Sequence, residues 1–111
     1  DFFGLDPAQY QFDYIIEQTF FCAIDPSRRS DYAKQMQKLL KPTGKLVGVL
    51  LDKHFESSPP FGGDKQEYET LFQQFFTIDT LAPCYNSIKP RQGSELFFIL
   101  SQKKVENARV L

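Results

Sequence analysis

The sequence contains few of the residues that build dedicated chemical sites. It has no tryptophan, one histidine (His54) and two cysteines, Cys22 and Cys84, which lack C-x-x-C spacing. A disulfide scaffold or a zinc site is therefore not expected, and we interpret both cysteines as small, buried, reduced residues of a cytoplasmic protein. His54 has no partner at base-orienting spacing, so we do not expect it to act as a general base.

Long apolar stretches and an excess of positive charge are also missing. Because no run of about 18 apolar residues is present, we expect no membrane span and no membrane partner. The formal net charge is −1, which argues against nucleic acid as a partner, since a phosphate backbone favours clustered Lys and Arg. The nearest approach to a basic patch is interpreted as solvated surface and comprises Lys89, Arg91, Lys103 and Lys104.

A glycine-rich nucleotide loop is the third absence. The chain has six glycines, but none of them, Gly62 and Gly63 included, follows a strand and opens a helix with the required spacing. What the chain does contain is 12 phenylalanines within an apolar content of 41% over 111 residues. This composition predicts a single domain, residues 1–111, with a core of aromatic rings.

Buried runs and amphipathic stripes alternate along the chain and predict an open α/β sheet. Residues 12–16 are apolar on both faces, which is typical of a buried central parallel strand. A helical stripe follows, capped by Ser27 or Ser30, and then a buried strand over residues 45–52. The first stripe comprises Tyr32, Ala33, Met36, Leu39 and Leu40.

The second half of the chain repeats the alternation and then departs from it. Asp64 and Glu67 form a capping box that predicts a helix start. Strands are expected at 77–81 and 95–101, and the connection between them is too short for a helical crossover, so these strands should be antiparallel. After the strand that ends in Asp52-Lys53-His54, a loop that includes residues 57–63 is predicted, and residues 103–111 are predicted to be a frayed tail. The second helical stripe comprises Tyr68, Leu71, Phe72, Phe75 and Phe76.

Four short motifs in this order resemble the S-adenosylmethionine-dependent methyltransferases of the thiopurine S-methyltransferase superfamily, which includes the plant thiol and halide methyltransferases. They are Asp1-Phe2-Phe3, the run from Phe20 to Pro26, Leu39 to Leu46, and Pro59-Pro60-Phe61. The resemblance covers nearly the whole chain. It implies the carboxyl-terminal half of a Rossmann-like class I methyltransferase sheet, strands four to seven, in which the last strand inserts antiparallel between two parallel neighbours.

The resemblance also implies site residues. Asp1 and Phe2 match positions that meet the adenine of S-adenosylmethionine, although Asp1 could instead be a polar residue that ends a strand. Glu17, Gln18 and Thr19 stand where the first strand ends, which is where open α/β sheets bind ligands. We predict cofactor contact for Glu17 and Gln18, and substrate contact for Gln18 and Thr19.

Aromatic and proline residues complete the predicted acceptor site. Phe20 and Phe21 either form an apolar wall for methyl transfer or pack in the core. Pro60 and Phe61 match a loop that covers the substrate, with a rigid surface turn as the alternative. Gln18 departs from the family, since an arginine stands there in the mammalian thiopurine enzymes and a tyrosine in the halide and thiol group.

Two functions remain open at this stage. The first is S-adenosylmethionine-dependent methyl transfer to a small thiol, thiopurine or halide, for which no metal is expected. The second is a catalytically silent α/β module that binds no cofactor and forms a homodimer through an exposed strand edge at residues 12–16.

Overall fold

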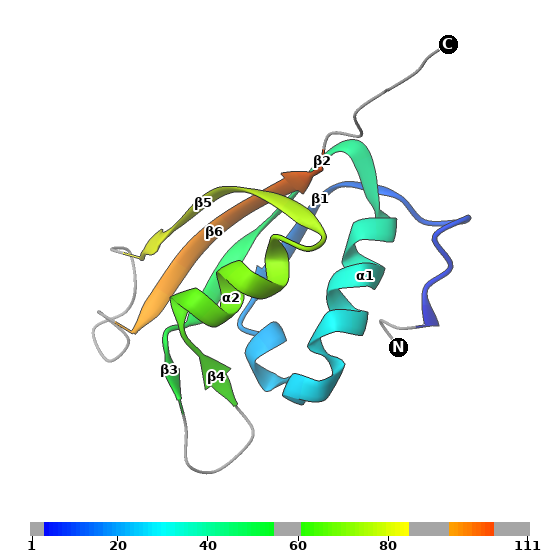
Figure 1. Cartoon of the computed structure of the whole chain (residues 1–111). Coiled ribbons are helices and arrows are strands. Elements are labelled where there is room, and N and C mark those ends of the chain that lie inside the picture. Colours follow the sequence, from blue (N-terminus) through cyan, green and yellow to red (C-terminus); the bar gives the residue numbers. More distant parts are fainter. Residues whose placement is uncertain (1–3, 55–60, 85–93, 104–111) are drawn as a thin grey trace.

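The computed structural model describes residues 4–54, 61–84 and 94–103, and it contains a four-stranded mixed sheet (Figure 1). The strand order is β1-β2-β6-β5, and β6 runs antiparallel to both of its neighbours while β1 and β2 are parallel. The predicted insertion of the last strand is therefore confirmed. The strands are β1 (Phe12–Gln18), β2 (Leu40–Leu51), β5 (Phe76–Pro83) and β6 (Glu95–Gln102).

Two α helices pack on one face of this sheet, α1 (Arg29–Leu39) and α2 (Lys65–Phe72) (Figure 1). The first predicted stripe is buried, since each of its five side chains is at most 3% exposed. The predicted serine caps are wrong. The carboxylate of Asp25 instead accepts a hydrogen bond from the Ser27 backbone N–H and begins a 3-10 turn, Pro26–Arg28, that leads into α1.

The capping box at the start of α2 is confirmed in its first half, because Asp64 Oδ1 accepts from the Glu67 backbone N–H at 2.9 Å. The helix is shorter than the stripe predicted. It ends at Phe72, and Phe76 already belongs to β5. Phe75 and Phe76 still enter the core, since a tight turn after Phe72 keeps both rings on the helix-covered side.

The predicted loop that includes residues 57–63 is not entirely irregular, because Gly62 and Gly63 belong to a strand. Lys53–His54 (β3) and Gly62–Gly63 (β4) pair antiparallel and form a small second sheet. Gly63 is required here because a Cβ atom would lie 2.8 Å from Tyr68 Oη. Gly62 has a φ of 68°, a conformation that glycine adopts without strain. Of the residues between β3 and β4, those numbered 55–60 lie outside the described part of the chain.

The prediction that β1 is buried on both faces is wrong for the described residues. Ile15 and Glu17 face the helices, whereas Tyr14 is 67% and Ile16 is 76% exposed. The reason is that both helices cover the same side of the sheet and β1 stands at its edge. Within the described ranges, no helix has the length and apolar character needed to cross a membrane.

Candidate functional site

The turn that follows β1 is organised by the buried carboxylate of Glu17, which is only 3% exposed. Glu17 Oε2 accepts from the Phe20 backbone N–H at 3.0 Å. Glu17 Oε1 accepts from the backbone N–H of Phe21 and, at 3.0 Å, from the Tyr32 hydroxyl. Both oxygens are thus used inside the chain. The carboxylate, which was predicted to meet the cofactor, holds the loop that carries the two phenylalanines.

The electrostatics of this buried group follow from its surroundings. Burial raises the pKa of Glu17, and the hydrogen bonds from Tyr32 and from the backbone of Phe21 and Phe20 oppose that rise. The pKa of Tyr32 is raised as well, first by burial and then by the charge of Glu17. Tyr32 therefore remains a neutral hydroxyl donor and helps α1 to hold the end of β1.

Thr19 occupies the sharpest point of the turn, with a φ of 57°. This left-handed conformation is unfavourable for a β-branched residue. Two hydrogen bonds hold it, since the Thr19 N–H donates to Val49 O at 3.1 Å and the Thr19 hydroxyl to Gln18 O at 2.7 Å. Strained residues of this kind are concentrated at functional sites.

The two adjacent phenylalanines take opposite positions. Phe20 is 51% exposed, and its ring lies 5.6 Å from that of Tyr32. Phe21 is 1% exposed and packs against Tyr32, Tyr68 and Phe72 in the core. The core alternative therefore holds for Phe21, whereas the ring of Phe20 is exposed and its role as an apolar wall stays a prediction.

Phe61 is brought to the same turn from a distant part of the sequence. Its backbone N–H donates to Cys22 O at 2.7 Å, which fixes the start of β4 against the 3-10 turn Phe21–Ala23. The Phe61 side chain is half-buried. Pro60, which precedes Phe61 and was predicted with it to cover the substrate, lies outside the described residues, as do Asp1 and Phe2.

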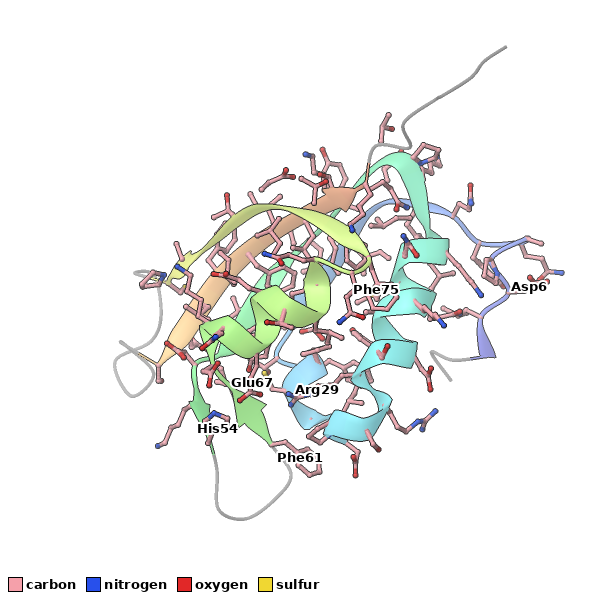
Figure 2. All side chains as sticks on the ribbon, viewed as in Figure 1. Asp6, Arg29, His54, Phe61, Glu67 and Phe75 are labelled. Atoms are coloured by element: carbon pink, nitrogen blue, oxygen red, sulfur yellow. The ribbon has the colours of Figure 1, made fainter. Side chains whose placement is uncertain are left out.

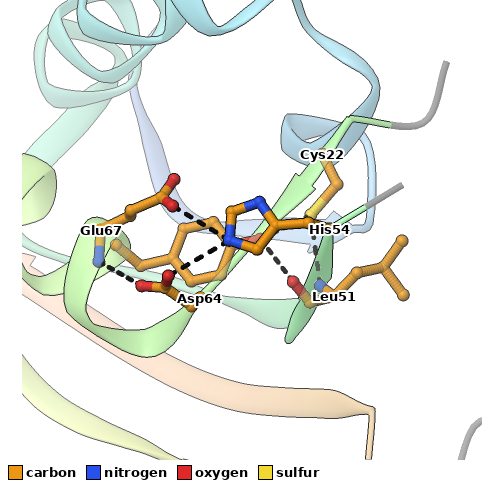
Figure 3. A network of polar contacts seen from close by, with 6 residues as sticks. Cys22, Leu51, His54, Asp64 and Glu67 are labelled. Carbon is orange, nitrogen blue, oxygen red and sulfur yellow. Dashed lines mark hydrogen bonds and ion pairs between the residues drawn. The ribbon is translucent and has the colours of Figure 1, made fainter. Parts of the chain in front are cut away.

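Cys22 belongs to a buried polar network that the sequence did not indicate (Figure 3). Its thiol sulfur accepts from the Leu51 backbone N–H at 3.2 Å and lies 3.3 Å from Tyr68 Oη, which donates to Leu51 O at 2.5 Å. Burial raises the pKa of Cys22, so the sulfur remains a thiol and is not a reactive nucleophile. The network connects the end of β2 to α2.

Arg29, at the start of α1, is a second residue that sequence reasoning missed. It is 6% exposed, its guanidinium lies 4.9 Å from the centre of the Phe21 ring, and Nη2 donates to Cys22 O at 3.4 Å. Arg29 Nε has no hydrogen-bond partner within the described part of the chain. Nothing in the sequence distinguishes it from the exposed Arg28 beside it, because only the packing of Phe21 buries it.

His54, which seemed isolated in the sequence, meets two carboxylates in space. His54 Nε2 lies 3.2 Å from Asp64 Oδ2 and 3.1 Å from Glu67 Oε1 (Figure 3). All three side chains are at least 45% exposed, and Figure 2 shows His54 and Glu67 near each other. The pairing of β3 with β4 creates this cluster, since it returns the chain to α2 next to His54.

Comparison with known proteins yields one family and several relatives. Residues 1–105 match the family described as thiopurine S-methyltransferase. The chain is 37% identical over 97 residues to probable thiol methyltransferase 2 of Arabidopsis thaliana and 33% identical over 98 residues to thiocyanate methyltransferase 1 of the same plant. Each match covers 86% of this chain and 42% of the relative, so the chain spans less than half the length of these curated proteins.

Solved structures show the same fold at low sequence identity. The 1,6-didemethyltoxoflavin-N1-methyltransferase of Burkholderia thailandensis superposes with a TM-score of 0.74 at 15% identity, over 93% of this chain and 48% of that one. An S-adenosylmethionine-dependent methyltransferase of Clostridium acetobutylicum gives 0.70 at 11% identity, over 94% of this chain and 63% of that one.

Proposed function

Since the chain belongs to the thiopurine S-methyltransferase family, we propose that it forms part of an enzyme that transfers the methyl group of S-adenosylmethionine to a small acceptor. The acceptor class is a thiol, a thiopurine or a halide-like anion. Relatives named thiol and thiocyanate methyltransferases support this class. The chain corresponds to 42% of their length, so the activity is proposed for a protein that also contains the remaining part of the fold.

The observation that carries the proposal is the rigid turn at the carboxyl end of β1. Ligands of open α/β sheets bind at this edge. Here the buried carboxylate of Glu17 and the left-handed Thr19 hold the backbone that carries the exposed Gln18 and Phe20. Such pre-organisation favours catalysis by positioning, which is what methyl transfer requires.

The described residues fit one end of the cofactor better than the other. An exposed aromatic face such as Phe20 suits a sulfonium cation, and the exposed Gln18, two residues earlier, offers a carbonyl acceptor and an NH₂ donor group. None of the described glycines forms a cradle for the methionine and ribose end. When bound, the cofactor supplies an activated methyl group, and the chain orients the acceptor and excludes water.

The neutral amide of Gln18 bears on acceptor choice. A thiolate or halide needs no strong general base for an in-line displacement, and none is provided near Phe20, since the Cys22 thiol is buried and protonated and Glu17 is turned inward. We propose that Gln18 contacts the acceptor by hydrogen bonding, without a formal charge.

Titration calorimetry with S-adenosylmethionine tests cofactor binding. We expect saturable binding by a protein that includes the segment upstream of residue 1, and weak or no binding by the 111-residue chain. A methyl-transfer assay over a panel of thiols, thiopurines and halides then tests the acceptor. Gln18→Arg should change the ranking of acceptors, whereas Gln73→Arg, at the exposed residue that follows the last residue of α2, should not. No transfer to any member of the panel by the longer protein would refute the proposed class.

We further propose that the 111-residue chain alone associates through β1. Within the described residues this strand pairs only with β2, and its free edge carries the exposed Tyr14 and Ile16. Free apolar edges are templates for pairing with a second copy. Light scattering should show dimers that Ile16→Lys disrupts and Thr77→Lys, on the opposite edge strand, does not. A monodisperse monomer at high concentration would overturn this proposal.

A further inference from the structure

Three side chains of different chemical types converge where β3, β4 and α2 meet. His54 Nε2, one oxygen of Asp64 and one oxygen of Glu67 all lie within 4.8 Å of one another. The two shortest separations, 3.1 Å and 3.2 Å, both involve the imidazole nitrogen (Figure 3). Ligand atoms about 2.0–2.2 Å from a common zinc ion are separated from one another by about 3.0–3.5 Å. The His54 distances match that geometry before any rearrangement.

The backbone holds this arrangement from two sides. His54 pairs with Gly62 in the β3–β4 ladder, which fixes its position relative to the start of α2. Asp64 Oδ1 accepts from the Glu67 N–H at 2.9 Å, so that Oδ2 is directed at His54. A hydrogen bond to the second oxygen of a ligating carboxylate is the usual way in which outer groups orient a metal ligand.

Charge and exposure also suit a cation. Two carboxylates face one imidazole, which gives the cluster a net charge of −2 with both carboxylates ionised and a neutral imidazole. The side chains of His54, Asp64 and Glu67 are 61%, 45% and 51% exposed. The cluster is therefore open to an entering ion and has room for water as the remaining ligands. One nitrogen and two oxygens favour zinc and neighbouring divalent transition metals over calcium or magnesium, which prefer oxygen alone.

We propose that His54, Asp64 and Glu67 form a binding site for a first-row divalent cation, with Zn²⁺ as its expected occupant. The ion connects β3 to the first turn of α2 and so stabilises the pairing of β3 with β4 next to Phe61. The site is structural and does not depend on the proposed methyl transfer.

Titration of the tag-free, EDTA-treated chain with Zn²⁺ tests the proposal, and Co²⁺ serves as a spectroscopic probe. We expect one saturable Zn²⁺ site and Co²⁺ visible absorption bands that Zn²⁺ abolishes. Asp64→Asn retains a residue that caps α2 well but removes the negative charge of this ligand. Glu67→Gln removes the negative charge of the second carboxylate. Each change, and His54→Ala, should weaken Zn²⁺ binding by more than the roughly tenfold caused by loss of an outer-shell partner.

Glu69→Gln is the matched control, because it removes one charge from the same helix outside the cluster. It should bind Zn²⁺ as the unchanged chain does. Zn²⁺ should also raise the melting temperature of the unchanged chain and of Glu69→Gln, but not that of His54→Ala. The alternative interpretation of the cluster is an ion pair of protonated His54 with no metal. Absence of saturable binding up to millimolar Zn²⁺, or equal binding by His54→Ala, would establish that alternative and overturn the proposal.

Discussion

Replacing Glu17 with glutamine should destabilise the chain, because one backbone N–H group then faces the NH₂ group of the glutamine side chain and loses its hydrogen-bond acceptor. In the native turn the two carboxylate oxygens accept from the backbone N–H groups of Phe20 and Phe21 and from the Tyr32 hydroxyl. Glutamine has one oxygen and one NH₂ group. If its oxygen faces Phe21 and Tyr32, its NH₂ group faces the Phe20 N–H, and that hydrogen bond is lost.

The expected loss follows from one unsatisfied donor in a mostly buried position. Leaving such a donor without a partner costs about 1–3 kcal/mol, so Glu17→Gln should lower the free energy of unfolding by that amount at neutral pH. Glu17→Ala removes all three hydrogen bonds and should cost about 3–5 kcal/mol. Gln18→Ala, at the exposed neighbouring position, should change stability by less than about 0.5 kcal/mol.

The pH dependence of the same pair gives an independent check. Because burial raises the pKa of Glu17 above its ordinary value of 4.5, the folded chain retains this proton to higher pH than the unfolded chain does. The contribution to stability is complete below the unfolded pKa and is lost as the pH rises through the folded pKa. Glutamine does not titrate, so the stability difference between the unchanged chain and Glu17→Gln should be larger in mild acid than at neutral pH.

Urea unfolding followed by circular dichroism measures these differences directly. The unchanged chain, Glu17→Gln, Glu17→Ala and Gln18→Ala would be compared at neutral and mildly acidic pH. If Glu17→Gln were as stable as the unchanged chain at both pH values, the carboxylate would not be the group that organises the turn, and the reasoning would fail.

Three further substitutions test other parts of the structure by the same measurement. A Cβ atom on Gly48 would lie 1.9 Å from Glu17 O, so Gly48→Ala should separate β1 from β2 and cost about 3 kcal/mol or more; a loss below about 1 kcal/mol would contradict the strand register. Thr19→Asn should gain about 0.5–1 kcal/mol, because asparagine tolerates the left-handed conformation better than threonine, and a clear loss of stability would show that this backbone is not strained. The Lys45 hydrogen bond, followed by that of Ser101, lowers the pKa of Asp79, so their stabilisation is present above the ordinary pKa of 3.8 and disappears as the pH falls through the folded pKa. Lys45→Met should therefore cost less than about 1 kcal/mol at neutral pH and nothing in strong acid; an equal cost at both pH values would refute the ion pair.

Local patterns predicted the elements of the fold well. The stripe of Tyr32, Met36 and Leu39 identified α1, and the buried run of β6 together with its short preceding connection predicted the antiparallel insertion that the structure contains. The serine caps failed because Asp25, two residues before Ser27, accepts the competing hydrogen bond. The predicted length of α2 was wrong because the apolar stripe continues past the end of the helix at Phe72. Phe75 and Phe76 belong to the stripe, but they reach the core after a turn that depends on tertiary packing.

The sequence predicted a candidate site at the carboxyl end of β1, which stays a prediction, whereas the structure decides which of its side chains face outward. The carboxyl end of β1 was identified because a polar triplet follows an apolar strand. Whether Glu17 faces a ligand or the core depends on Tyr32, which is 15 residues away in sequence and reaches the carboxylate only after α1 packs on the sheet. The same holds for Phe20 and Phe21, which are adjacent and chemically identical but have opposite exposure.

The sequence by itself therefore determined the order of the α helices and of the strands of the main sheet, the antiparallel last strand and the family to which the chain belongs, because these depend on local periodicity and short motifs. Tertiary structure alone decided that Glu17 organises the turn, that Arg29 is buried, and that His54 meets Asp64 and Glu67. Each of these depends on contacts between residues far apart in the chain, and such contacts form only when β3 and β4 pair and both helices settle on one face of the sheet.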